Sequence, residues 1–276
     1  MESSGQPLPG LYGIRDIAAR VDALCDELVA KLQNKGLKAE GDSAAAVRHE
    51  IEFQAITACF FAFARDLFNS VRRLEESGCL VPSRILARSL FEALVSLLYI
   101  ETDPEKHTER FLSYAHAQSY KRLLTSRQLG YPDPLEAAQV LTDWESVKDK
   151  HGTKKNDSVP RLNWHGRNLA EILEELTKRN NAYLRLKKDY LIYYKGDSEF
   201  VHASVEAIGE YIKVPGQSKS WVLYPEPAPR DRIAILARCS QWMLWILAAV
   251  HGFLWLGPPE GALELQREVE ELANDP

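Results

Sequence analysis

Cysteine is scarce in this chain and is never clustered. Structural zinc sites and disulfide frameworks draw on closely spaced cysteines, so we expect neither. The seven histidines are also dispersed, without an HExxH motif or repeated ExxH pairs, and we therefore expect no metal and no cofactor. The four cysteines stand among apolar neighbours and form no Cys-x-x-Cys pair: Cys25, Cys59, Cys79 and Cys239.

The chain also lacks a dominant sign of charge. With 34 Lys and Arg against 39 Asp and Glu, its net charge of -5 predicts no overall attraction to nucleic acid or to an anionic membrane. The opening "MESSGQPLPGLYGIRD" has neither the basic nor the apolar part of a secretory signal, so we expect a cytoplasmic protein.

One long apolar run contests that expectation. Residues 242–256, "WMLWILAAVHGFLWL", are nearly all apolar, but they are fewer than the roughly 20 residues that a membrane helix needs. We predict a core helix and no membrane partner. Its aromatic residues are expected to pack against the long 44–77 helix: Trp242, Trp245, Phe253 and Trp255.

Helical periodicity and helix-end signals recur along nearly the whole sequence. They predict an all-α fold, a bundle of about eight or nine helices with long central helices. No composition shift marks a boundary, so residues 1–276 are predicted to form a single domain. The stretch 151–166, "HGTKKNDSVPRLNWHG", is polar and broken by glycine and proline, which indicates a loop. The predicted helices cover about 14–34, 43–77, 82–101, 104–129, a fifth from Asp133 and Pro134, 169–194 with a break near 179–180, a long apolar helix after 230, and a charged tail helix.

Two charged residues stand in an otherwise apolar helix. Arg88 and Glu92, four residues apart in "RSLFEALVSLLYI", share one helix face and are surrounded by leucines. We predict that both are buried and paired, because a lone buried charge costs several kcal/mol. We expect their partners to be four polar residues spaced four apart, which share one helix face if the helix through Tyr194 continues: Tyr190, Tyr194, Ser198 and His202.

These residues predict a pocket. Arg88 would hold an anionic group, Tyr194 and Ser198 would donate hydrogen bonds, and His202 and Glu92 would be the catalytic residues that move a proton. The 151–166 loop would add Trp164, able to stack on a base, and Arg161, able to meet a phosphate together with Arg167. A satisfied polar network that only fixes helix register is the alternative.

Three segments in this order, "ARSLFEALVSLLYI", "NWHGRNLAEI" and "SEFVHAS", resemble the bacterial family of unknown function DUF5677. The resemblance covers about residues 50–255, with an N-terminal helix and a C-terminal tail helix flanking that core. It implies an all-helical intracellular protein, and it does not point to an activity. The residues that define the pattern here are Arg88, Glu92, Trp164, Tyr194, Ser198 and His202.

Three classes of function stay open on this sequence. The first is a protein that binds an anionic ligand such as a nucleotide or RNA. The second is a ribonuclease or defence toxin like the helical HEPN domains, whose Arg and His are separated by four to six residues; Arg110 and His116 satisfy that spacing, but one match is what chance gives. The third is a structural or interaction module. Catalysis and homo-oligomer formation are both left open.

Overall fold

The structure is a computed structural model that describes residues 9–35, 43–153, 156–161, 163–195, 212–213, 222–223 and 228–274. The described residues are almost entirely helical, which confirms the predicted all-α multi-helix fold. The helices are α1 (Pro9–Lys35), α2 (Ala44–Glu76), α3 (Leu80–Glu101), α4 (Pro104–Gln128), α5 (Ala137–His151), α6 (Leu169–Arg179), the 3-10 helix η1 (Asn181–Tyr183), α7 (Leu184–Asp189), the π-helix η2 (Tyr190–Tyr194), α10 (Pro229–Phe253) and α11 (Ala262–Asn274). The strands are β1 (Gly152–Thr153), β2 (Asn156–Pro160), β3 (Ile212–Lys213) and β4 (Val222–Leu223).

The chain divides into two compact units. The first unit comprises residues 1–38, 54–98 and 173–276, and the second comprises residues 39–53 and 99–172. That the whole chain forms one domain stays a prediction.

Local signals place several helix starts where the sequence predicts them. The Ser43 hydroxyl accepts a hydrogen bond from Ala46 N at 3.2 Å, and Asp103 caps α4 by accepting from Lys106 N, with Pro104 at the first helical position. The fifth helix is a correction, because it begins at Ala137 instead of directly after Asp133. The Asp133 carboxylate is bound by Arg127, at 2.9 and 2.7 Å, and so does not cap a helix.

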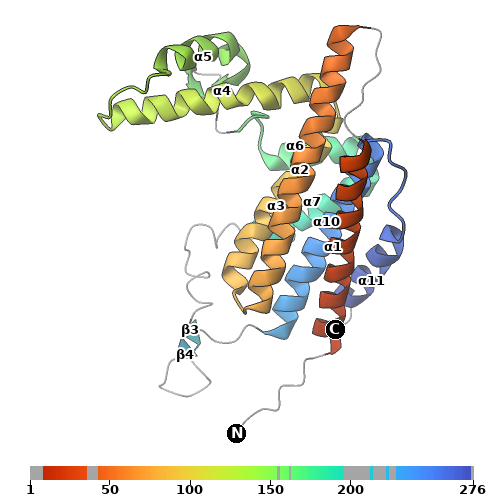
Figure 1. The fold of residues 1–276 in the computed structure, drawn as a ribbon. Coiled ribbons are helices and arrows are strands. Elements are labelled where there is room, and N and C mark those ends of the chain that lie inside the picture. The colour runs from red at the N-terminus through yellow and green to blue at the C-terminus, as the bar shows by residue number, and fades with distance from the viewer. Residues whose placement is uncertain are drawn as a thin grey trace. The chain divides into compact units, whose positions relative to one another are not determined.

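The apolar helix α10 lies in the core of the first unit. It packs against α1 and α11, and the three helices lie side by side in Figure 1. Trp242, Met243, Leu247 and Val250 have no exposed surface, which confirms the prediction of a core helix. Trp255 is a correction: α10 ends at Phe253, the chain turns with Trp255 at φ 54°, and its side chain is 83% exposed.

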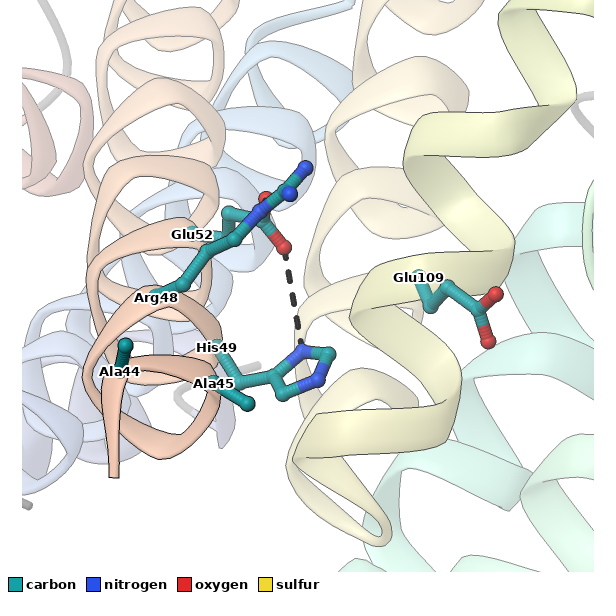
Figure 2. A pocket seen from close by; sticks show the side chains of 6 residues that line it. All are labelled: Ala44, Ala45, Arg48, His49, Glu52 and Glu109. Atoms are coloured by element: carbon teal, nitrogen blue, oxygen red, sulfur yellow. Dashed lines mark hydrogen bonds and ion pairs between the residues drawn. The ribbon is translucent and has the colours of Figure 1, made fainter. Parts of the chain in front are cut away.

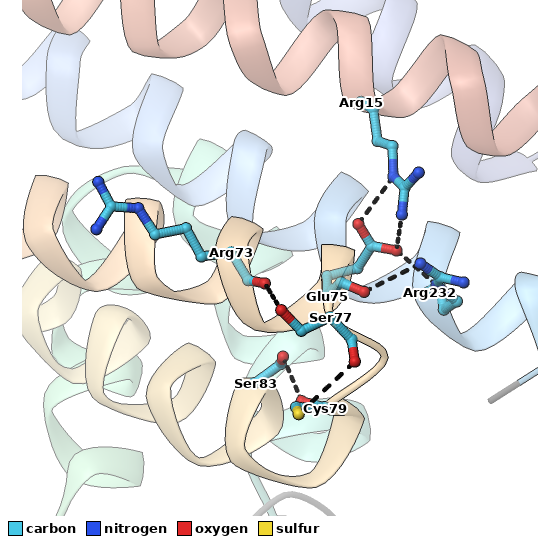
Figure 3. Close-up of polar contacts among 7 residues, drawn as sticks. All are labelled: Arg15, Arg73, Glu75, Ser77, Cys79, Ser83 and Arg232. Carbon is cyan, nitrogen blue, oxygen red and sulfur yellow. Dashed lines mark hydrogen bonds and ion pairs between the residues drawn. The ribbon is translucent and has the colours of Figure 1, made fainter. Parts of the chain in front are cut away.

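A buried carboxylate joins three helices of the first unit. Glu75 at the end of α2 has a fully buried side chain, and Figure 3 shows its carboxylate between the guanidinium groups of Arg15 on α1 and Arg232 on α10. Arg15 donates to it through Nε and Nη2, both at 3.0 Å, and Arg232 donates through Nε at 2.5 Å. Charge-assisted hydrogen bonds of this kind compensate the cost of burying the charge.

The second unit is built on an antiparallel pair of helices. α4 packs against α5, and strand β2 packs on both. The predicted 151–166 loop is corrected here, since β1 and β2 form a short antiparallel hairpin whose register is irregular between Gly152 and Thr153. The hairpin leads into the turn at 163–168, which precedes α6.

Candidate functional site

The predicted cluster around Arg88 forms within the first unit. Arg88 Nε donates to Glu92 Oε1 at 3.2 Å, Arg88 Nη2 donates to the Tyr194 hydroxyl at 3.0 Å, and that hydroxyl donates to Glu92 Oε1 at 2.5 Å. The three side chains therefore close a triangle of hydrogen bonds, which confirms that Arg88 and Glu92 pair with each other and with Tyr194.

Packing in the core of the first unit holds Tyr194 in place. Its ring lies 5.6 Å from that of Phe91, and Phe91 in turn lies 4.9 Å from Trp242 of α10. Just before the π-helix, Asp189 accepts a hydrogen bond from Trp242 Nε1 at 2.8 Å, and burial raises the pKa of Asp189. The contact between Asp189 and Trp242 therefore ties the start of the π-helix to α10, and the π-helix places Tyr194 over Arg88.

The burial predicted for this cluster is wrong in part. The Arg88 side chain is 21% exposed and that of Glu92 is 46% exposed. The face of α3 that carries Glu92 is therefore half open to solvent. Burial, together with the neighbouring Glu92 carboxylate, raises the pKa of Tyr194 to about 12. The phenol therefore stays protonated and donates a hydrogen bond to Glu92. Arg88 is already neutralised by Glu92, and the cluster carries no excess positive charge for an anion.

The other predicted site residues fall elsewhere. Ser198 and His202 lie outside the described residues, and the catalytic roles predicted for His202 and Glu92 stay predictions. Arg161 and Trp164 belong to the second unit, whereas Arg88 belongs to the first. The described residues therefore bring together Arg88, Glu92 and Tyr194.

Trp164 anchors the turn of the second unit to an aromatic core. Its side chain is only 8% exposed and lies 5.5 Å from Phe111 and 5.8 Å from Tyr99, measured between ring centroids. Little ring surface is left on which a base could stack, so in this structure the ring fixes the turn beside Arg161.

Arg161 is held firmly by its backbone and side chain. Its N–H donates to His151 O at 2.8 Å, its carbonyl accepts from the Tyr114 hydroxyl at 2.9 Å, and its Nε donates to Gly152 O at 2.7 Å. These bonds leave both terminal nitrogens of the guanidinium without a protein partner among the described residues.

A second arginine meets Arg161 beside Gly166. A Cβ atom added to Gly166 would lie 2.9 Å from Arg110 Nη2 and closer still to Arg161 Nη1, so both guanidinium groups occupy the space that a side chain would fill. Gly166 also has a φ of +66°, a conformation that glycine adopts without strain. We call Arg110 and Arg161 the arginine pair.

The arginine pair has no carboxylate partner among the described residues. Arg110 donates to the carbonyl of Lys150 at 3.2 Å, and its Nε is buried without any hydrogen-bond partner in the described structure. Burial, together with the charge of Arg161, lowers the pKa of Arg110. Two like charges therefore face each other, partly buried and uncompensated, which is unfavourable unless an anion joins them.

Two buried histidines lie near the arginine pair. Burial and the neighbouring cations lower the pKa of His151 to about 4, and burial lowers that of His165 to about 4, so both rings are neutral at pH 7. His151 Nε2 lies 2.9 Å from the Ser113 hydroxyl, which also lies 3.3 Å from Arg110 O, so the hydroxyl proton has two acceptors within reach. The Ser113 hydroxyl therefore links α4 to His151 at the end of α5.

A cavity of about 510 Å³ opens between α2 and α4 in the second unit (Figure 2). His49 lies between two carboxylates, with Nδ1 3.9 Å from Glu52 and Nε2 3.8 Å from Glu105, while Arg48 bonds Glu52 at 2.7 Å and Glu109 bonds Lys150. Arg48 and Lys150 are therefore already paired with carboxylates beside this cavity. Among the described residues, no group of three or more His, Cys, Asp or Glu side chains could hold a metal ion.

The described residues define an all-helical protein with one satisfied polar cluster and one uncompensated arginine pair. The model of a family of unknown function, DUF5677, matches residues 54–219, more than half of the chain, and the chain belongs to this family. The match spans both the Arg88 cluster and the arginine pair. No curated protein and no solved structure matches the chain.

Sequence reasoning missed Arg110 as a ligand-binding candidate. It appears in the sequence as part of an Arg–His spacing with His116, but His116 lies 3.3 Å from Asp143 and Arg110 meets Arg161 instead. The two arginines come from α4 and from the turn after β2, so no local pattern in the sequence could have paired them.

Proposed function

We propose that this protein binds a ligand with an anionic phosphate group, such as a nucleotide or RNA, and that the arginine pair holds the phosphate. The observation that carries the proposal is the convergence of Arg110 and Arg161 at Gly166 without a carboxylate among the described residues. Guanidinium groups offer planar forks of N–H donors that match phosphate oxygens.

The position of Arg161 supports binding at low entropic cost. Its backbone and its Nε are held by Gly152 and Tyr114, so the terminal nitrogens are fixed before a ligand arrives. Arg88, by contrast, has Glu92 as its counter-ion, and a second anion there would face a carboxylate. The Arg88 cluster is better explained as architecture that fixes how α3 and the π-helix pack.

Thermal unfolding with and without inorganic phosphate tests the proposal. A ligand at 100 times its Kd adds about 2.7 kcal/mol of stability, which raises the Tm by several degrees in a chain of this size. The rise should be lost in Arg161→Gln and in Arg110→Gln. Arg122→Gln is the matched control, because Arg122 lies exposed on α4 and bonds Ser119.

The control separates site binding from the general stabilising effect of phosphate salts. An equal Tm rise in the parent and in all three variants would overturn the proposal, as would no rise at all. Incubation with structured RNA, followed by a measurement of its cleavage, is a second test. Cleavage that depends on Arg110 would move the assignment to the ribonuclease class.

We also propose that the protein works in the cytoplasm. Of the described helices, only α10 is long and apolar enough to cross a membrane, and its apolar residues are mostly buried against α1 and α11. Recovery of the full chain from a lysate without detergent is the expected result. Recovery in the membrane fraction alone would contradict this.

A further inference from the structure

We infer that the group bound at the arginine pair is a terminal phosphate, as in a mononucleotide, and not an internal phosphodiester of a nucleic acid. This inference rests on the proposed function and narrows its ligand class. It follows from the charge of the arginine pair, from the charge balance of the second unit and from the partial burial of the pair.

The charge of the pair fits a dianion. Arg110 and Arg161 together carry two positive charges with no described carboxylate beside them. A terminal phosphate monoester carries between 1.5 and 2 negative charges at pH 7, about the number needed. An internal phosphodiester carries a single negative charge and would leave one guanidinium uncompensated.

The charge balance of the second unit does not favour a nucleic-acid backbone. The second unit has 12 Lys and Arg against 15 Asp and Glu, an acidic balance. Several of its basic side chains already have carboxylate partners: Arg48 with Glu52, Arg127 with Asp133, Lys148 with Glu145, and Lys150 with Glu109. Proteins that bind nucleic acid neutralise many phosphates in a row, and the acidic balance of this unit does not favour that.

The partial burial of the arginine pair favours an end-on ligand. Arg110 Nε is fully buried and Gly166 leaves room for the two guanidinium groups but for no side chain. Trp164, the aromatic residue nearest in sequence to the turn glycine, is buried and offers no platform for a row of bases. A terminal phosphate carries a single substituent and can approach such a partly buried pair end-on, whereas an internal phosphate is flanked by sugars on both sides.

Calorimetric titration of the full chain with four probes tests the inference. The probes are AMP, inorganic phosphate, dimethyl phosphate as a singly charged diester, and an oligoadenylate of twelve nucleotides without terminal phosphates. AMP and inorganic phosphate should bind at least tenfold more tightly than dimethyl phosphate, and the oligoadenylate should not bind. Adding a 5′-phosphate to the oligoadenylate should restore binding.

Variants assign the signal to the site. Arg161→Gln and Arg110→Gln should each weaken AMP binding at least tenfold, Arg161→Lys should recover part of it, and Arg122→Gln should bind as the parent does. If one glutamine variant does not fold, the other decides. An oligoadenylate without terminal phosphates that binds as tightly as AMP, and through Arg161, would overturn the inference while the proposed function stands. If none of the probes binds, both fall.

Discussion

Two pairs of arginines in this molecule differ in what lies between them. In the first unit Arg15 and Arg232 share the buried carboxylate of Glu75. In the second unit Arg110 and Arg161 meet with no carboxylate among the described residues. The first arrangement is complete as the protein stands and joins three helices. The second has no anion between its guanidinium groups, as expected of a phosphate-binding site before its ligand arrives.

The largest loss of stability is expected at Glu75, which lies between Arg15 and Arg232. Glu75→Gln would leave two guanidinium groups at a buried site without their counter-ion, and breaking a buried charge pair costs about 3 to 5 kcal/mol. Urea unfolding should show this loss. Glu76→Gln, one residue further along α2 and exposed, should change little. Equal small losses in both variants would mean that Glu75 contributes no more than a surface charge.

An intermediate loss of stability is expected on acidification, and it depends on the two buried histidines near the arginine pair. His151 and His165 stay neutral in the folded chain down to about pH 4, whereas in the unfolded chain they take up protons near pH 6.5. The unfolded state therefore binds more protons between these values, and stability should fall as pH drops from 6.5 to about 4.

Unfolding midpoints of His151→Gln across this pH window check the prediction. The variant should lose less stability on acidification than the parent does. His116→Gln is the matched control, since His116 is part-exposed and lies beside Asp143. The same slope in all three proteins would show that His151 is not the group that resists protonation.

The Arg88 cluster should give a smaller loss. Because the Glu92 side chain is 46% exposed, Glu92→Gln should cost about 1 kcal/mol, well below the cost at Glu75. Tyr194→Phe should cost a similar amount, with Tyr190→Phe as its control, in urea unfolding. A loss at Glu92 as large as at Glu75 would mean that the half-open face of α3 is covered in solution.

The smallest effect is expected at the uncompensated pair itself. Without phosphate, Arg110→Gln should change the free energy of unfolding by less than about 1 kcal/mol, because relief of like-charge repulsion offsets the lost bond to Lys150 O. The same urea measurement applies. A loss of about 3 kcal/mol or more would reveal a hidden counter-ion and remove the contrast between the two pairs.

Local rules predicted much of this fold. The caps at Ser43 and Asp103, the break at Asn180 and the apolar α10 all follow from residues within a turn or two of each other, and so does the spacing that pairs Arg88 with Glu92. The partnership with Tyr194 was also predicted, because a polar residue in an apolar helix requires a partner.

Contacts between distant segments could not be predicted in the same way. The sequence around Glu75, "RRLEES", has the composition of an exposed charged surface, and only the packing of α1 and α10 makes it a buried centre. The arginine pair likewise depends on how the β1–β2 hairpin folds back on α4. The π-helix at Tyr190–Tyr194 was missed because one inserted residue leaves no clear mark in an apolar helical pattern.

The packing of α1 against α10 has a consequence for how the chain is made. α1 ends at Lys35 and α10 begins at Pro229, so the apolar face of α1 emerges from the ribosome long before the helix that covers it. Contacts of such long sequence separation form late and slowly. During synthesis the first unit must persist with an uncovered apolar surface, which makes nascent chains stopped before α10 candidates for chaperone binding and aggregation.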